Sequence, residues 1–219
     1  MASTQPIFLT NKFARYLYLL LAVFVLTGAA PPPRIILFLG DSITAGYGIE
    51  QSLAYPAIIQ AKIDAKQWSF KTINAGQSGD TSAGGLSRLN WLLKNRIDAL
   101  VLELGGNDGL RGLPPETTQK NLQAIIDGTK AKYPGVKIVI AGMVVPPNMG
   151  RDYEKKFNAI FPELAKRNQA ALIPFILEGV GGVRELNLPD GIHPTEKGHE
   201  IVANNVWKVL EPVLKTLAR

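Results

Sequence analysis

The 219-residue chain contains no cysteine and only two histidines. Without cysteine there is no thiol nucleophile, no disulfide framework, no thiolate metal site and no position for a lipid anchor. His193 and His199 lie on either side of an expected helix start and have no clear third ligand, so we predict no metal site. Each imidazole is informative because histidine is the side chain that titrates near neutral pH.

Runs of basic residues are also absent. The formal net charge is +6, but the lysines and arginines are scattered singly and form no stripe with aromatic residues. This pattern is typical of a solvated surface, so we expect no nucleic-acid partner. With 46% hydrophobic residues the chain can bury one sizeable core, which predicts a single domain over residues 31–219.

The apolar run at 16–26 is shorter than the roughly 20 residues that a transmembrane helix needs. Lys12 and Arg15 precede it and small residues follow it at 27–30, which is the order of a secretory signal. We therefore predict a signal peptide over residues 1–30, cleaved near Ala29 or Ala30, and a periplasmic or secreted protein. Proline directly after the cleavage point is unfavourable, so an uncleaved N-terminal membrane anchor is the alternative.

Short apolar runs alternate with helical patterns from residue 34 onward. The first run, IILFL at 35–39, is continuously apolar, as expected for a strand buried on both faces. Further strands are predicted at 70–74, 99–104, 136–141 and 171–177, and helices at 52–65, 82–95, 116–132, 152–169 and 195–217. Pro212 is expected to kink or divide the last helix. The alternation predicts an α/β fold of three layers, with a doubly wound parallel sheet of five strands between helices.

Polar and glycine-rich segments follow several of the predicted strands. GDS at 40–42 follows the first strand, NAGQSGD at 74–80 the second and GGND at 105–108 the third, while DGIHP at 190–194 comes after the fifth. In a doubly wound sheet the ligand site lies outside the carboxyl ends of the strands, near the point where the strand order reverses. We expect these four segments to meet at that edge.

Ser42 and His193 have the chemistry of a nucleophile and its base, because a serine hydroxyl needs a group such as imidazole to take its proton at neutral pH. Asp190, across a glycine turn from His193, can hold the ring in the required tautomer and stabilise the imidazolium. The pattern predicts an acyl hydrolase with these three residues as its triad. The Asn107 amide and the backbone N–H groups of Ser42 and Gly79 are the expected oxyanion donors.

Each motif taken alone has a plain structural interpretation. The loop at 40–48 lacks the lysine of a P-loop, the G-x-G-x-x-G of a dinucleotide site and the G-x-S-x-G of an α/β-hydrolase elbow, so by itself it is a tight turn. Asn107 suits a turn, and His199 is expected to be a helix residue just after the N-cap Thr195. The functional interpretation depends on the four segments together.

Together, GDS at 40–42, SGDTS at 78–82, GGND at 105–108 and DGIH at 190–193 resemble the four blocks of the SGNH hydrolases, also called the GDSL esterase family. The resemblance runs from residue 34 to about residue 212, and ELGGNDGLRG at 103–112 is most similar to the bacterial periplasmic thioesterase, arylesterase and lysophospholipase branch. It implies a flavodoxin-like sheet and no metal or organic cofactor. It also implies Ser42 as nucleophile, His193 as base and then acid, Asp190 as the residue that orients it, and an oxyanion hole from Ser42, Gly79 and Asn107. Asp41 and Asp108 are expected to hold loops by hydrogen bonds.

Apolar residues after the third and fourth strands, namely Leu110, Leu113, Met143 and Val145, predict the acyl site. We expect a monomeric serine esterase that acts on small-molecule acyl esters, extending to thioesters or lysophospholipids, and that meets a membrane only through an uncleaved N-terminal segment. A carbohydrate O-deacetylase is the alternative enzyme, although few aromatic residues are placed to stack on sugar rings. A non-catalytic binding module is the alternative outside enzymes.

Overall fold

The computed structural model describes residues 31–145 and 147–218, so the signal or anchor predicted over residues 1–30 lies outside the described residues. Within them, parallel strands form one five-stranded sheet in the order β2-β1-β3-β4-β5. The strands are β1 (Arg34–Gly40), β2 (Phe70–Gly76), β3 (Ala99–Glu103), β4 (Lys137–Ala141) and β5 (Ala171–Ile173). This is the flavodoxin-like order, and it confirms the predicted fold class.

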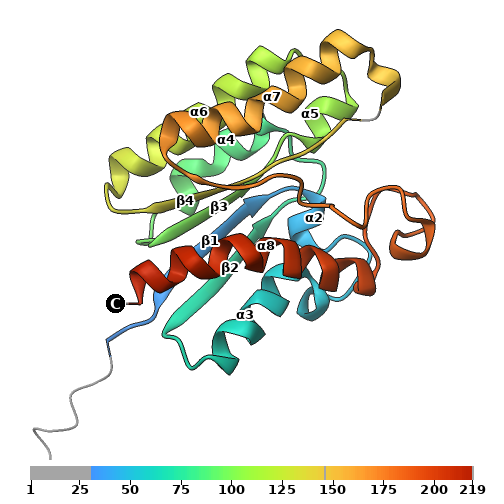
Figure 1. Cartoon of the computed structure of the whole chain (residues 1–219). Helices are drawn as coiled ribbons and strands as arrows, with labels where there is room; N and C mark the ends of the chain where they lie inside the picture. The colour runs from blue at the N-terminus through green and yellow to red at the C-terminus, as the bar shows by residue number, and fades with distance from the viewer. Residues whose placement is uncertain (1–30, 146, 219) are drawn as a thin grey trace, which may run out of the picture. The chain divides into compact units, whose positions relative to one another are not determined.

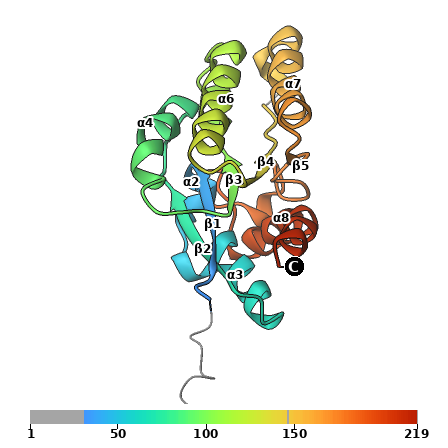
Figure 2. The same cartoon turned by 90° about the vertical axis from the view of Figure 1, so that its left-hand side faces the viewer.

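Helices cover both faces of the sheet. The long helices are α3 (Tyr55–Ala65), α4 (Ser82–Leu92), α6 (Pro115–Lys132), α7 (Arg151–Asn168) and α8 (Glu196–Leu217). On one face α3 packs beside α8, and on the other α4, α6 and α7 lie in a row (Figure 1, Figure 2). Because β1 leads through α3 to β2 on one side, and β2 leads through α4 to β3 on the other, the strand order reverses between β1 and β3.

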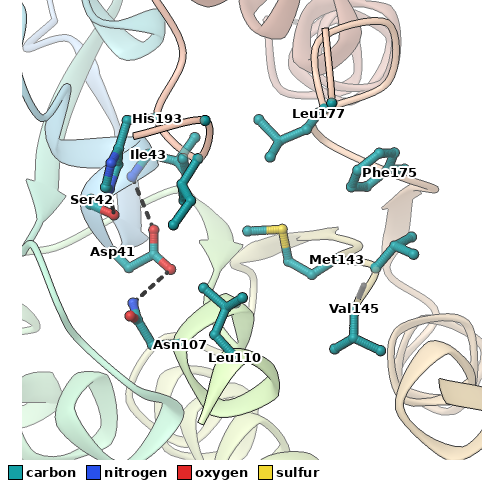
Figure 3. A pocket seen from close by; sticks show the side chains of 16 residues that line it. Asp41, Ser42, Ile43, Asn107, Leu110, Met143, Val145, Phe175, Leu177 and His193 are labelled. Atoms are coloured by element: carbon teal, nitrogen blue, oxygen red, sulfur yellow. Dashed lines mark hydrogen bonds between the residues drawn. The ribbon is translucent and has the colours of Figure 1, made fainter. Parts of the chain in front are cut away.

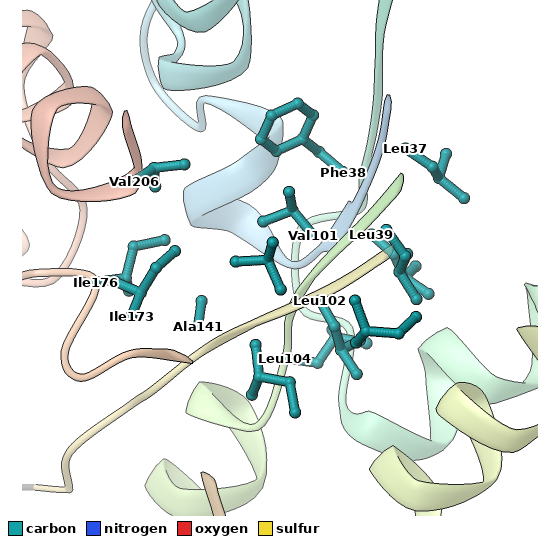
Figure 4. Packing of buried hydrophobic residues seen from close by; sticks show 14 of the residues in the cluster. Leu37, Phe38, Leu39, Val101, Leu102, Leu104, Ala141, Ile173, Ile176 and Val206 are labelled. Carbon is teal, nitrogen blue, oxygen red and sulfur yellow. The ribbon is translucent and has the colours of Figure 1, made fainter. Parts of the chain in front are cut away.

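The core is built around β1 and β3, whose residues are buried on both faces. Leu37, Phe38 and Leu39 of β1 are all buried, and their side chains alternate between the two helical layers. Figure 4 shows this packing. Val206 of α8 lies on one side of the sheet, and Leu104 lies toward the opposite side. Each large side chain buried in this way stabilises the fold by about 1.5–3 kcal/mol, so the strand ends that carry the polar loops are firmly anchored.

The fifth strand is shorter than the predicted range 171–177, since β5 ends at Ile173. Pro174 has no N–H to donate to a ladder, and the Ile176 N–H instead donates to the Gly142 carbonyl at 3.0 Å. Gly142 itself leaves no room for a side chain, because a Cβ there would lie 2.1 Å from the Pro174 carbonyl oxygen. The chain therefore turns away from the sheet after three residues, and the residues that follow Pro174 are free to line a cavity.

The predicted helices differ from the observed ones mainly at their ends. The helix expected at 52–65 begins only at Tyr55, after a separate 3₁₀ turn at Gln51–Leu53 and an extended Ala54. Pro212 does not divide α8, which continues through it because Leu210 and Leu214 on either side are buried in the core. None of the helices in the described residues is both long and apolar enough to cross a bilayer.

Two short helices occur where the sequence predicted only loops. They are α2 (Ser42–Ala45), directly after β1, and α5 (Gly106–Leu110), directly after β3. Helices this short carry no hydrophobic period, so the sequence gives no sign of them. Both begin at the edge where the strand order reverses, which places their first residues at the expected ligand site.

Candidate active site

Ser42 is the first residue of α2 and lies at the carboxyl end of β1. Asp41 caps this helix, since its Oδ1 accepts the Ile43 N–H at 3.0 Å. Gly46 ends the helix in the left-handed conformation, with φ of +76°, and its N–H donates to the Ser42 carbonyl. A glycine is needed at that point because the turn closes within four residues, and the serine is thereby held at a fixed angle to the sheet.

His193 lies within hydrogen-bond reach of Ser42, although the two are far apart in sequence. The imidazole Nε2 is 2.9 Å from Ser42 Oγ, and the two side chains lie together in Figure 3. The imidazole Nδ1 is 2.8 Å from Asp190 Oδ2. A carboxylate beside Nδ1 favours the tautomer with its proton on that nitrogen, which leaves the Nε2 lone pair directed at the serine hydroxyl. The arrangement is that of a nucleophile, a base and the group that orients the base.

Asp190 is held by its own loop as well as by the imidazole. Its Oδ1 accepts the backbone N–H groups of Ile192 at 2.9 Å and His193 at 3.0 Å, across Gly191 with φ of +72°. These two backbone bonds and the bond to the His193 ring lower the pKa of Asp190 to about 2. The carboxyl therefore stays ionised at any pH at which imidazole is a useful base.

The three N–H groups predicted as oxyanion donors lie after β1, β2 and β3, at the same edge of the sheet. Within the described residues, the Ser42 and Gly79 backbone N–H groups donate to no other protein atom. The Asn107 amide on α5 donates to the Asp80 carbonyl at 2.9 Å and makes a longer bond of 3.3 Å to Asp41 Oδ2. Since the longer bond is the weaker, that N–H is the more easily released of the two.

The loop that carries Gly79 is fixed by groups that the sequence did not single out. Arg88 on α4 donates to Asp80 Oδ2 at 2.7 Å and also to the Gly40 carbonyl at 3.1 Å. It thereby ties this loop to the end of β1, just before the serine. Arg111 donates to the Gly79 carbonyl at 3.0 Å and fixes the orientation of the next peptide. Arg88 lies outside the quoted motifs, and Arg111 lies within the 103–112 segment but has no chemical signal of its own, which is why neither was predicted to hold this loop.

A buried polar network lies beneath the serine turn. Glu103, at the end of β3, is fully buried and accepts the Asp41 N–H at 3.2 Å and the Thr44 hydroxyl at 2.6 Å. Burial, reinforced by the charge of Asp41, raises the pKa of Glu103 well above its usual range. Burial also raises the pKa of Asp41 to about 6, against the opposing bond from the Ile43 N–H. The network thus fastens α2 to β3, with Tyr55 adding a further hydrogen bond to Thr44.

His199 lies in α8, as expected for a helix residue, and it is fully buried. Its Nδ1 accepts the Tyr55 N–H at 3.2 Å, so it supports the start of α3 and makes no contact of this kind with Ser42. Burial, with a smaller effect from the charge of His193, lowers the pKa of His199 to about 4. Asp108 holds loops as predicted, accepting the Ser82 N–H at 2.8 Å and the Thr118 hydroxyl at 3.1 Å.

A cavity of about 560 Å³ opens beside Ser42 and His193 and is lined mainly by apolar side chains (Figure 3). Leu110, Met143 and Val145 line it, together with Ile43, Phe175, Leu177 and Ile192, which sequence reasoning missed. Leu113, which was expected beside them, does not line it. The reason is α5: Leu110 ends this helix, and the chain turns at Gly112, with φ of +63°, before it reaches Leu113.

Metal ligands are not grouped in the described part of the chain, where no three histidine or carboxylate side chains lie close enough to hold an ion together. The groups that the cavity does offer are a serine hydroxyl, an imidazole bonded to a carboxylate, and N–H donors. Such a constellation suits acyl transfer to the serine oxygen.

Comparison with known proteins agrees with this class of site. Residues 38–201 match the model of the GDSL-like lipase/acylhydrolase family. The chain is 42% identical over 195 residues to esterase TesA of Pseudomonas aeruginosa, covering 89% of this chain and 96% of that protein. It is 39% identical over 207 residues to thioesterase 1/protease 1/lysophospholipase L1 of Escherichia coli K12, covering 93% and 96%.

A solved structure supports the same assignment. The psychrotrophic esterase EstA from Pseudoalteromonas sp., in a form inhibited by monoethylphosphonate, superposes with a TM-score of 0.78 at 33% identity, covering 83% of this chain and 99% of that one. The fold and the family match together define a hydrolase with a three-layer α/β/α architecture. The chain belongs to the GDSL-like lipase/acylhydrolase family, the SGNH hydrolases.

Proposed function

We propose that the protein is a serine esterase that hydrolyses carboxylic esters through an acyl-enzyme, with Ser42, His193 and Asp190 as its triad. The observation that carries this proposal is the pair of short hydrogen bonds that His193 makes, 2.9 Å to Ser42 Oγ and 2.8 Å to Asp190 Oδ2. The names of the relatives, an esterase and a thioesterase, support the same reaction class.

In the first half of the reaction, Ser42 Oγ bonds to the ester carbonyl carbon while its proton moves to His193 Nε2. The carbonyl oxygen becomes an oxyanion and accepts hydrogen bonds from the Ser42 and Gly79 backbone N–H groups and from Asn107. When the intermediate collapses, the bond to the leaving group breaks, and His193 returns the proton to the leaving oxygen or sulfur. Water then attacks the acyl-enzyme with His193 again as base, which releases the acid and restores Ser42.

The substrate proposed is an ester with an apolar acyl group. Met143, Val145 and Phe175 give the cavity a wall that favours hydrocarbon over a polar sugar. Thioesters and lysophospholipids place the same acyl chain in the same position, so they belong to the proposed range. An acetylated sugar would bury polar hydroxyls against these side chains without partners, and it is the weaker candidate.

A serine-directed phosphonate tests the proposal. The wild type should lose activity and carry the label on Ser42, whereas Ser42→Ala should be inactive, unlabelled and folded, because it lacks the oxygen that forms the covalent bond. EstA was solved in a form inhibited by a phosphonate, which makes the reagent a natural choice. Labelling at another residue, or ester turnover by Ser42→Ala, would refute the assignment.

The N-terminal segment is proposed as an export signal, with residues 31–219 as the hydrolase domain and the periplasm or exterior as its location. Lys12, Arg15 and the apolar run at 16–26 support this proposal. Expression with the natural N-terminus in a Gram-negative host, followed by N-terminal sequencing, tests it. A chain shortened by about 29 or 30 residues outside the cytoplasm supports cleavage. Full-length protein in the membrane fraction indicates the uncleaved anchor, and full-length cytoplasmic protein contradicts both.

A further inference from the structure

Tyr47 makes a close aromatic contact with the proposed base. Its ring centroid lies 4.4 Å from that of the His193 imidazole, with the two planes inclined at 41°. The Tyr47 residue is 50% exposed, so hydrophobic burial alone does not explain where the ring lies. The two rings lie in contact at a tilt, and this contact joins the nucleophile turn to the histidine loop.

The backbone around Tyr47 is shaped to bring the two loops together. Gly46 and Gly48 flank it in the left-handed region, with φ of +76° and +79°, and the Tyr47 N–H donates to the Ser42 carbonyl at 3.1 Å. A Cβ at Gly48 would lie 2.5 Å from Leu188 Cδ1, so the turn touches the segment that leads to His193. The Leu188 N–H in turn donates to the His193 carbonyl at 2.7 Å.

The contact between Asp190 and the His193 imidazole is open to solvent. The Asp190 side chain is 37% exposed and the His193 side chain 18% exposed. An ion pair that water can reach contributes little to fixing a side chain, since solvent screens the attraction. Asp190 sets the tautomer of His193, but it leaves the faces of the ring unsupported. The Tyr47 ring lies beside the imidazole at a tilt of 41°.

We propose that Tyr47 is a positioning residue for His193: its ring holds the imidazole at the angle that serves Ser42 and stabilises the imidazolium formed during acyl transfer. The inference rests on the proposed function, because the imidazolium forms only if the Ser42 proton moves to His193 Nε2. An aromatic face attracts a cation that lies against it, and the attraction is strongest where water is partly excluded. The neutral imidazole gains much less from the same contact, so the ring favours the charged state.

Other charged or titratable groups also face His193. Asp190 lies on its own loop, Asp41 on the nucleophile turn and His199 on α8, and the charge on His193 is felt by each of them. All three are unchanged in a variant that alters only Tyr47. A change in the pH dependence of such a variant is therefore due to loss of the aromatic ring.

The test compares Tyr47→Leu, Tyr47→Phe and a matched control, Trp91→Leu, which removes an exposed aromatic ring from α4. With p-nitrophenyl acetate, Tyr47→Leu should lower kcat by about two- to fivefold and leave KM within about twofold. The acid limb of its kcat/KM profile should move to lower pH by about half a unit, because the imidazolium loses a stabilising neighbour. Tyr47→Phe keeps the ring and should stay within about twofold of wild type, and Trp91→Leu should match wild type.

Thermal unfolding of each variant separates positioning from folding, since a half-exposed ring on a surface turn should change Tm little. If Tyr47→Leu kept the wild-type kcat and the wild-type acid limb, the inference would be wrong. It would also be wrong if Tyr47→Phe lost as much kcat as Tyr47→Leu, because the effect would then belong to the hydroxyl. Phosphonate labelling distinguishes the two proposals. If Ser42 is labelled and Tyr47→Leu behaves as wild type, only the role of Tyr47 is lost; if Ser42 is not labelled, the triad and this inference are both wrong.

Discussion

The shape of the cavity predicts a shallow dependence of activity on acyl-chain length. One part of its wall is rigid and buried, with Met143 6% and Val145 4% exposed, while Leu110 and Ile192 at the mouth are 50% and 47% exposed. Full burial of a methylene stabilises binding by about 0.8 kcal/mol, which is about fourfold in kcat/KM. A chain with one side against the buried wall and the other near solvent should gain about half of that, or about twofold for each methylene.

A series of p-nitrophenyl esters from acetate to octanoate measures this slope, because kcat/KM reports acylation of the enzyme. The increase over the series should be about 60-fold, whereas a closed pocket would give an increase of several thousandfold. A slope near fourfold for each methylene would show that the chain is fully enclosed. A flat series would show that it does not enter the cavity at all.

Met143→Asp tests the location of the chain. A carboxylate in the buried wall has to be desolvated beside hydrocarbon, so octanoate should lose about 30- to 100-fold and acetate less than about threefold. Leu113→Asp is the matched control, because Leu113 follows α5 but does not line the cavity, and it should keep the wild-type slope. Equal losses for both esters in Met143→Asp, or a selective loss of octanoate in Leu113→Asp, would refute this placement of the acyl site.

Three further predictions concern the oxyanion, the buried histidine and metal dependence. Asn107→Ala should lower kcat by about 10²–10³ with little effect on KM, as for loss of one oxyanion donor, and a change in KM alone would contradict that role. The pKa of His199 falls from its ordinary 6.5 to about 4, which corresponds to about 3 kcal/mol of unfolding free energy that is present above pH 6.5 and lost as the pH falls toward 4. Denaturant unfolding should show this loss for wild type relative to His199→Asn, whose Oδ1 can still accept the Tyr55 N–H, and a pH-independent difference between the two would contradict it. Activity should survive EDTA, and loss that a divalent metal restores would indicate a metal-dependent hydrolase.

The strands could be predicted because a strand buried on both faces is continuously apolar. The run IILFL at 35–39 has this pattern, and β1 is where it was expected. The same rule extended β5 too far, since the residues after Ile173 are also apolar. Pro174 marks the end of the strand, because proline cannot donate to the ladder. A strand that ends there leaves Phe175 and Leu177 to line the cavity.

The motifs of the candidate site could be predicted from the sequence, but the residues that hold these motifs in place could not. Residues such as Ser42 and His193 belong to compact segments that a doubly wound fold brings to one edge, so topology alone brings them together. Arg88, Glu103 and Tyr47 make contacts between segments, and no local pattern shows which partners they have. Glu103 shows the difficulty best: a charged residue at a strand end is ordinarily taken as exposed, yet here it is fully buried and bonded to the backbone of Asp41.

The oxyanion donors and the buried part of the acyl wall follow different strands, which has a consequence for how the substrate range can change. Ser42, Gly79 and Asn107 follow β1, β2 and β3, whereas Met143 follows β4 and Phe175 follows β5. Hydrogen bonds through Arg88 and Glu103 fix the first group to one another without passing through β4 or β5. Substitutions near Met143 and Phe175 can therefore change the shape of the acyl wall while the nucleophile and the oxyanion donors stay in place. Substrate range should thus respond to substitutions near Met143 and Phe175, and the rate of the chemical step to the loops of β1 to β3 and to the segment that carries Asp190 and His193.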